Sequence, residues 1–319
     1  MLKNYLKTAF RGFAKHKGFT FINTSGLAIG IACCLLIFVY VKDELTHDQY
    51  HEKTDQLYRI TGSIDFGGRE VPLSSTSIIV PKVFKEEIPE IENFARLNNQ
   101  SAIIKHGDEY IGNSRVLFAD PGLLEMFDFE QLSGNLSVAL SELNNVVFTR
   151  NAAERFFGKT DVVGETISIR LKSTFETLKV AGVIENHPVN SSFSFEQLIP
   201  WKKNESYKQA LELINWGTLS NNTFVELAPG ANPQSVIDKM QLVREKHHPD
   251  STDFVRRIHS DLQALKDLHL STVYGAGSGL KRTSDPVYSY VLSGIAFLIL
   301  IIACINFTNL NGCCSLPWS

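Results

Sequence analysis

The stretch FTFINTSGLAIGIACCLLIFVYV, residues Phe19 to Val41, contains no acidic or basic side chain. A bilayer hydrocarbon core of about 30 Å is crossed by roughly 20 helical residues, so this stretch is long enough to span a membrane. A second uncharged stretch, VYSYVLSGIAFLILIIACINF, covers Val287 to Phe307. Two buried helices of a large soluble protein are the alternative, but such helices rarely continue this far without a charge. We therefore expect two transmembrane helices, at residues 19–41 and 287–309.

The charged residues lie before and between these two stretches. The 319-residue chain has 31 Lys and Arg, 34 Asp and Glu and a formal net charge of -3, and residues 42–286 hold 26 of the basic and all 34 of the acidic side chains. The mean hydropathy of -0.04 averages apolar ends with a polar middle. This layout argues against a soluble cytoplasmic enzyme and against a disordered chain. It also provides no basic field, so we expect no nucleic-acid partner.

The first 18 residues have the pattern of a helix that lies on a membrane surface. Apolar side chains recur at helical spacing, while basic side chains occupy the rest of the helix. The apolar residues include Leu2, Leu6, Phe10 and Phe13, and the basic residues include Lys3, Lys7 and Arg11. We expect residues 1–18 to form a cytoplasmic amphipathic helix that contacts the lipid bilayer.

Charge also orients the chain in the membrane. Residues 1–41 carry five basic and no acidic side chains, and such segments stay on the cytoplasmic side. A cleaved signal peptide is the alternative for this end, but its apolar core would be shorter and small residues would follow it. The prediction is a protein of the cell inner membrane, with a cytoplasmic N-terminus and residues 42–286 in the periplasm.

Residues 42–286 are numerous enough for a packed core, and we expect two subdomains. None of the five cysteines falls in this range, so its stability does not depend on disulfides. Strand and helix patterns alternate, which predicts an α+β domain with much antiparallel pairing. The expected strands are Gln56–Asp65, Ile91–Asn98, Ser101–Lys105, Tyr110–Phe118, Asn145–Thr149, Thr166–Leu171, Leu178–Ile184 and Thr223–Leu227. The expected helices are Thr76–Glu87, a short one capped by Asp120, Asn151–Phe157 ending at Gly158, and Pro233–Lys246 capped by Asn232.

Two motifs invite a chemical interpretation. Ala153 to Thr160 fits the phosphate-loop pattern A-x4-G-K-T, but that chemistry needs a strand before the loop and a helix after it. Here a helix precedes Gly158 and a strand follows, so we expect this glycine to cap the helix. His47 and His51 have the i, i+4 spacing of a metal-binding pair without a convincing third ligand. We expect them on a solvated, charge-rich helix just outside the membrane.

The sequence contains no nucleophile elbow, and no cysteine is present in the middle domain. We therefore expect no catalytic residue, no metal and no cofactor.

Within the first apolar stretch, Gly26, Gly30 and Cys34 place small residues one helical turn apart, and such a stripe lets another helix approach closely. The alternative is a flexible span that merely contains glycine. The prediction is a helix-packing face.

Several of these segments resemble MacB/FtsX-type permeases of ABC transporters. FINTSGLAIGIACC from Phe21, DELTHDQYHEK from Asp43 and LYR from Leu57 are similar to the N-terminal part of such permeases. The segment 153–164 is similar to a stretch of their periplasmic core domain, and 303–310 to the end of their second span. The resemblance covers nearly the whole chain.

The resemblance implies a MacB-like periplasmic core domain between the first two spans of a permease. It further implies a separate ABC ATPase subunit that hydrolyses ATP, and a second permease copy or half in a dimer or pseudo-dimer. Such permeases convert ATP-driven motion into movement of the periplasmic domain, and they export or extract peptides, antibiotics or lipoproteins. Some act with a periplasmic adaptor and an outer-membrane channel. The chain itself is then not an enzyme.

One departure from the family pattern concerns the C-terminal end. After Leu310 such permeases continue with a basic cytoplasmic segment and more spans, whereas here a short, uncharged tail at 310–319 follows. We expect a truncated chain. A two-span membrane sensor with an extracytoplasmic ligand-binding domain is the alternative function, and a membrane-tethered hydrolase is a third class without a recognisable site.

Overall fold

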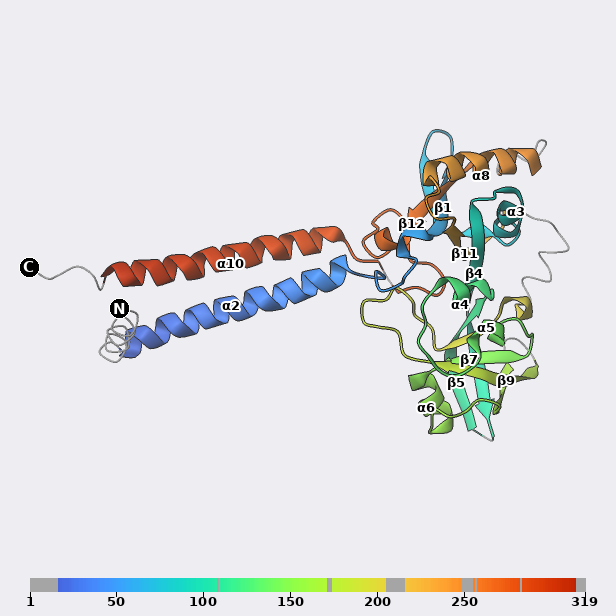
Figure 1. Cartoon of the computed structure of the whole chain (residues 1–319), viewed down its shortest axis with the longest axis horizontal. Helices are drawn as coiled ribbons and strands as arrows, with labels where there is room; N and C mark the ends of the chain where they lie inside the picture. Colours follow the sequence, from blue (N-terminus) through green and yellow to red (C-terminus); the bar gives the residue numbers. More distant parts are fainter. Residues whose placement is uncertain are drawn as a thin grey trace, which may run out of the picture. The chain divides into compact units, whose positions relative to one another are not determined.

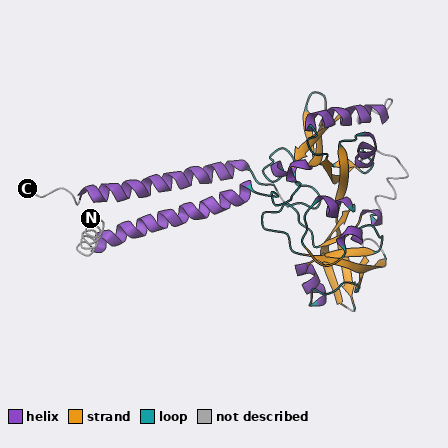
Figure 2. Cartoon of the chain, viewed as in Figure 1, coloured by secondary structure: helices purple, strands orange, loops and turns teal. Residues whose placement is uncertain are grey.

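The computed structural model describes residues 17–107, 109–170, 174–204, 216–247, 255, 257–281 and 283–313. The chain divides into two compact units. The helical unit combines residues 1–45 with 285–319, and the α/β unit comprises residues 46–284. The described strands all belong to the α/β unit (Figure 2).

Two long helices make up the described part of the helical unit. They are α2 (Lys17–Leu45) and α10 (Pro286–Cys313), and each contains a segment long and apolar enough to cross a membrane, Thr20–Leu45 and Pro286–Ile305. Only 6% and 11% of their most apolar windows are buried. Large apolar side chains therefore face outward along both helices. This arrangement suits a lipid environment, whereas the core helices of a soluble protein bury such side chains. The expected spans at 19–41 and 287–309 fall within these helices.

The α/β unit is built on one mixed sheet, in which the order of described strands is β12-β1-β11-β4-β5-β10-β7-β9-β6. β2 pairs with β1, β3 with β11, and β8 with both β4 and β9. The strands are β1 (Leu57–Asp65), β2 (Glu70–Leu73), β3 (Thr76–Ser77), β4 (Ile91–His106), β5 (Glu109–Ala119), β6 (Gln131–Gly134), β7 (Asn145–Thr149), β8 (Thr166–Arg170), β9 (Phe175–Ile184), β10 (Gln197–Pro200), β11 (Leu219–Leu227) and β12 (Ile258–Ala264).

Short helices cover this sheet (Figure 1). They are α3 (Val80–Glu87), α4 (Gly122–Met126), α5 (Leu136–Ala139), α6 (Arg150–Phe157) and α8 (Pro233–His247), with the 3-10 turns η1 (Thr54–Gln56), η2 (Trp201–Lys203) and η3 (Leu265–Asp267). Most strand pairs are antiparallel, and β7–β9 and β5–β10 are parallel. The predicted α+β class with much antiparallel pairing is confirmed.

Strand β4 connects the two halves of the sheet. Its first part, from Ile91 to Leu97, pairs with β11, and its second part, from Leu97 to His106, pairs with β5. One apolar cluster lies under α3 and α8 around Phe84, and another lies under α6 around Phe148. A third cluster, around Phe127, lies between them in the part of the sheet that carries α4 and α5. The long strand thus belongs to both halves.

Several local predictions are confirmed. The strand Asn145–Thr149 occurs as expected, and α6 ends at Gly158 in the left-handed conformation, with φ of 69°. A glycine adopts this conformation without the steric cost of a side chain. The carbonyl oxygen of the Asn232 side chain accepts the backbone N–H of Gln234 at 2.9 Å, which makes it the predicted N-cap.

Other local predictions are wrong. The segments Ile91–Asn98 and Ser101–Lys105 form one continuous strand, because β11 and β5 pair with its successive parts. Residues Thr76 and Ser77 pair with β11, so α3 starts only at Val80, just before Pro81. Asp120 does not cap α4 with its side chain, because its carboxylate binds an arginine instead.

Candidate functional site: a polar anchor in the α/β unit

The first residues of the α/β unit are fixed to a loop that is distant in the sequence. Asp48 is fully buried and has φ of 57°, a value rare for residues other than glycine. Its backbone N–H donates to the carbonyl of Asn190 at 2.9 Å, and its carboxylate accepts the backbone N–H of Ser192 at 2.7 Å. Two hydrogen bonds from one residue, one of them charge-assisted, compensate the backbone strain.

Two aromatic residues continue this attachment. The Tyr50 hydroxyl donates to Ser191 Oγ at 2.9 Å, and burial raises the pKa of Tyr50 to about 12. The His51 Nδ1 accepts the backbone N–H of Asp128 at 3.0 Å, and the His51 ring packs edge-on against Phe127. Burial lowers the pKa of His51, which favours the neutral ring that this acceptor role requires.

The last residues of the α/β unit bind the same loop. The backbone N–H of Lys281 donates to Ser192 O at 2.7 Å, and that of Ser194 donates to Gly279 O at 2.9 Å. Gly279 has φ of 83°, and a Cβ there would lie 2.9 Å from Leu117, so no other residue fits without strain. We call the segments 46–56, 186–196 and 265–284 together the anchor.

A stacked histidine pair joins the first and last segments of the anchor directly. The rings of His47 and His269 lie 3.6 Å apart at their centroids and 7° from parallel. His269 also accepts, through its backbone carbonyl, the N–H of Ser284 at 2.7 Å. The first and last segments are therefore attached both to one loop and to each other.

Arg59 on β1 fastens the last segment to the sheet. Its guanidinium is fully buried and donates to the carbonyls of Gly275 and Ala276, both at 2.9 Å, and to Gln263 Oε1. Burial lowers the pKa of Arg59 to about 10, so the side chain is still a cation at neutral pH. Carbonyl oxygens supply the partners that a buried cation needs.

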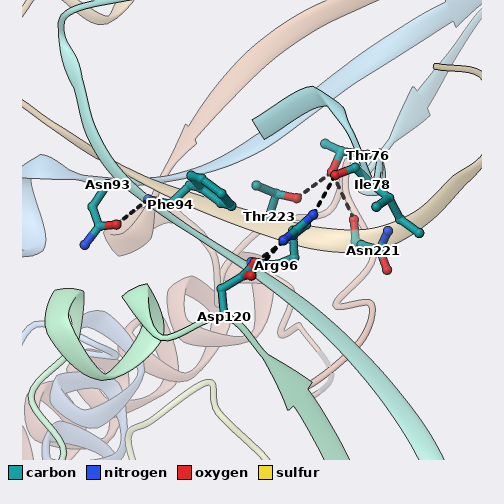
Figure 3. A network of polar contacts seen from close by, with 8 residues as sticks. All are labelled: Thr76, Ile78, Asn93, Phe94, Arg96, Asp120, Asn221 and Thr223. Atoms are coloured by element: carbon teal, nitrogen blue, oxygen red, sulfur yellow. Dashed lines mark hydrogen bonds and ion pairs between the residues drawn. The ribbon is translucent and has the colours of Figure 1, made fainter. Parts of the chain in front are cut away.

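A second polar network holds the middle of β4 (Figure 3). The Arg96 guanidinium donates to both carboxylate oxygens of Asp120 at 2.7 Å and to Ile78 O at 2.9 Å. The Asp120 carboxylate also accepts the backbone N–H of Arg96 at 2.9 Å. Both side chains are buried, 9% and 11% exposed. This pair links β4, the end of β5 and the segment before α3 at the boundary between the two halves of the sheet.

The structure places the three small residues of the first apolar stretch on the side of α2 that faces α10. A Cβ on Gly30 would lie 3.2 Å from the Ala303 Cβ, and the Cys34 thiol donates to the carbonyl of Ala296 at 3.2 Å. Gly26 and Gly30 line a groove between the two helices. The expected surface helix of Leu2, Leu6, Phe10 and Phe13, with Lys3, Lys7 and Arg11, lies outside the described residues.

The other motifs have structural roles. Lys159 of the phosphate-loop pattern forms an ion pair with Glu165 at 3.3 Å, and the pattern begins inside α6 and ends just after it. The interpretation of His47 and His51 as part of a solvated helix is wrong, because α2 ends at Leu45 and both rings are buried in the anchor, 7% and 2% exposed. Among the described residues, no three His, Cys, Asp or Glu side chains gather as metal ligands.

The contacts of the anchor do not follow from the sequence pattern. In the segment from Asp43 to Lys53 the pattern indicates a family resemblance and a spaced histidine pair, and its many charged residues are typical of a solvated helix. The useful signal was that Asp48, Tyr50 and His51 follow closely after the end of an apolar helix, where the α/β unit begins. The partners of Asp48 and Tyr50 at 190–192 lie more than 130 residues away, and His51 binds Asp128, 77 residues away.

Fold and site together define a class of protein, in which a mixed α/β domain is inserted between two apolar helices and both of its ends are attached to one loop. The model of the MacB-like periplasmic core domain matches residues 20–243. The chain belongs to this family of ABC transporter permease domains, which confirms the resemblance seen in the sequence.

A solved structure with a TM-score above 0.5 has the same fold. A permease-protein domain from Porphyromonas gingivalis is 24% identical, with a TM-score of 0.55 over 76% of this chain and 98% of that chain. The periplasmic region of MacB from Actinobacillus actinomycetemcomitans has 13% identity and a TM-score of 0.47, covering 66% of this chain and 89% of its own. The extracellular domain of the ABC-type transporter YknZ from Gram-positive bacteria has 11% identity and a TM-score of 0.43, covering 65% and 99%. No curated protein matches the chain.

Proposed function

We propose that this chain is a permease subunit of a MacB/FtsX-type ABC transporter. It lies in the cell inner membrane with its N-terminus in the cytoplasm, and residues 42–286 are periplasmic. ATP is hydrolysed by a separate ABC ATPase subunit, and two permease copies or halves act together. Family membership and the two apolar helices support this proposal.

The observation that carries the proposal is the double attachment of the anchor. Thr46 follows directly after α2, and Asp285 connects Ser284 directly to α10, so the covalent chain leads from each helix into the anchor. Both incoming segments are hydrogen-bonded to the loop around Ser192. We propose that a displacement of either helix end moves this loop, which is the behaviour that a mechanically coupled permease needs.

The small-residue stripe fits the same proposal. In lipid there is no hydrophobic driving force between helices, so they associate through close packing. We propose that Gly26, Gly30 and Cys34 form the packing face of the first span. The close approach of Gly30 to Ala303 and the Cys34 hydrogen bond support this assignment.

Peptides, antibiotics or lipoproteins are the proposed cargo class, exported or extracted from the membrane, with a periplasmic adaptor and an outer-membrane channel as further partners. The α/β unit then acts by moving, and substrate does not cross it through a wide pore. The chain itself is then not an enzyme, and the hydrogen bonds of Asp48, Tyr50 and His51 to distant segments fit a structural role.

The proposal is tested by hydrogen exchange on the full chain co-purified with its ATPase subunit in lipid nanodiscs. Trapping the complex with ATP is expected to change the protection of segments 46–56, 186–196 and 265–284 together, relative to the ADP state. Helix α6 serves as an internal control whose protection should stay constant. Unchanged protection throughout the anchor, with ATP binding verified, would contradict mechanical coupling through it.

A further inference from the structure

A tight turn in the loop of the anchor presents an apolar side chain to the outside. The backbone N–H of Ser191 donates to the carbonyl of Pro188 at 3.2 Å, which closes a β-turn over residues 188–191. Val189 lies at its tip and is 84% exposed, more than any other large apolar side chain of the described residues. Turns favour Gly, Pro, Asn, Asp and Ser, so the backbone conformation does not account for a valine here. Single exposed valines are common, and the position of the turn therefore decides what Val189 can contact.

The turn is held close to the end of α2. Asn190, the residue after Val189, donates from its side-chain Nδ2 to the carbonyl of Thr46 at 3.4 Å. Its own carbonyl accepts the backbone N–H of Asp48 at 2.9 Å. Thr46 follows directly after Leu45, the last residue of α2. One hydrogen bond and one peptide bond thus connect the neighbour of Val189 to the apolar helix.

The same turn is attached to the segment that leads into α10. The Lys281 ammonium donates to the carbonyl of Val189 at 3.1 Å, and the backbone N–H of Lys281 donates to Ser192 O at 2.7 Å. Only four residues separate Lys281 from Pro286, where α10 begins. The backbone of Val189 is therefore fixed beside both connections between the α/β unit and the long helices.

Aromatic side chains indicate where the membrane surface crosses these helices. Tyrosine prefers the headgroup level of a bilayer, and Tyr40 of α2 and Tyr288 and Tyr290 of α10 are 42%, 64% and 75% exposed. Tyr40 lies five residues before Leu45, which is about 8 Å along a helix. The headgroup layer on each side of the hydrocarbon core is about 5 to 7 Å thick. The residues just after α2 and just before α10 therefore lie at or just outside the headgroups.

We propose that the turn at 188–191 contacts the phospholipid headgroup layer of the bilayer that holds α2 and α10, with the Val189 side chain inserted among the headgroups. The inference rests on the proposed membrane location of the chain. Insertion removes the apolar side chain from water, and the hydrogen bonds from Asn190 and Lys281 keep the turn at the surface. The loop that binds both ends of the α/β unit then also contacts the lipid.

The test measures tryptophan fluorescence of the full chain in nanodiscs made with or without brominated phospholipid, which quenches tryptophan on contact. The variant V189W is expected to lose about half of the added emission in brominated discs. V163W is the matched control, because Val163 is also an exposed valine of the α/β unit, 44% exposed, but lies outside the anchor. Its added emission should stay unchanged. The unmodified chain gives the background of the natural tryptophans.

A third variant separates this inference from the proposed membrane location. Leu36 of α2 is 71% exposed, so L36W reports whether the helix itself lies in lipid. Quenching of L36W and V189W, with V163W unchanged, is the expected result. Quenching of L36W with V189W unchanged, or equal quenching of V189W and V163W, overturns the contact of the turn and leaves the membrane location intact. No quenching of L36W overturns the membrane location and this inference with it.

Discussion

At the scale of single residues, each buried polar group fixes one particular partner, whereas contacts in the apolar core are less directional. Asp48 and the Arg96–Asp120 pair are almost fully enclosed; Asp48 connects segments far apart in the chain, and the Arg96–Asp120 pair connects two neighbouring strands. A buried charge is costly without a partner, so the loss of one partner should cost more than the hydrogen bond itself contributes.

Substitution of Asp48 tests the anchor. The variant D48A loses the acceptor of the Ser192 N–H and places alanine at a positive φ, and we expect a loss of about 2–3 kcal/mol in unfolding free energy. D48N should lose less, because asparagine tolerates this backbone conformation. Thermal unfolding of the full chain in detergent measures both. D161N, at an exposed aspartate, is the control, and a melting temperature of D48A equal to that of D161N would refute the role of Asp48.

Substitution of Asp120 tests the pair in Figure 3. D120N removes the negative charge and leaves the Arg96 cation buried, which is expected to lower the free energy of unfolding by about 3–5 kcal/mol. Chemical denaturation of the full chain measures this change in unfolding free energy, and D161N is again the control. A change below about 1 kcal/mol would show that carbonyls and aromatic rings near Arg96, including Trp201 at 4.8 Å from the guanidinium carbon, suffice to hold it.

At the scale of elements, the segment 265–284 has little regular structure and depends on glycines for its path. Gly279 combines a positive φ with close contact to Leu117, whereas Gly164 has φ of 94° and open space around it. A comparison of substitutions at the two glycines therefore distinguishes the effect of backbone strain from the effect of steric overlap.

We expect G279A to be more destabilising than G164A by about 1–3 kcal/mol, because the added methyl group overlaps Leu117 in addition to the shared backbone strain. Parallel thermal melts of the two variants measure the difference. Equal melting temperatures would mean that Leu117 moves aside and that the approach of this segment to the sheet is not fixed at Gly279.

At the scale of the whole molecule, stability should decrease in acid because the anchor and its surroundings bury neutral histidines. Burial lowers the pKa of His187 to about 4 and also lowers that of His51. The unfolded chain therefore binds more protons than the folded chain between the ordinary histidine pKa of about 6.5 and about 4, so the free energy of unfolding falls as the pH drops through that window.

Melting temperatures of the full chain between pH 7.5 and pH 4.5 should show this decline. The variant H187Q removes one of the titrating groups, so its melting temperature should change less over the same range. An identical pH dependence of H187Q and the unmodified chain would exclude His187 as a source of the effect.

The sequence predicted much of this architecture and little of the anchor. The length of the apolar stretches predicted the two long helices, and a short run of strand-forming residues predicted the strand Asn145–Thr149, because both patterns are local. Asp120 was assigned to a helix cap because a local partner is the default for an aspartate before proline. Its true partner, Arg96, is brought near by pairing of β4 with β5. The sequence predicts a hairpin of 101–105 with 110–118 but a separate strand at 91–98, so it does not place Arg96 beside the end of β5. For the same reason, Asp48 could not be connected to Ser192 in advance.

The length of β4 has a geometric consequence. About ten residues separate Arg96 from the far end of the strand at His106, which at about 3.3 Å per residue amounts to roughly 30 Å. If the strand tilts about the Arg96–Asp120 pair by about 10°, its far end moves by roughly 5 Å over that length. A rotation at the Arg96–Asp120 pair would thus displace the far end of β4 much more than the residues next to the pair.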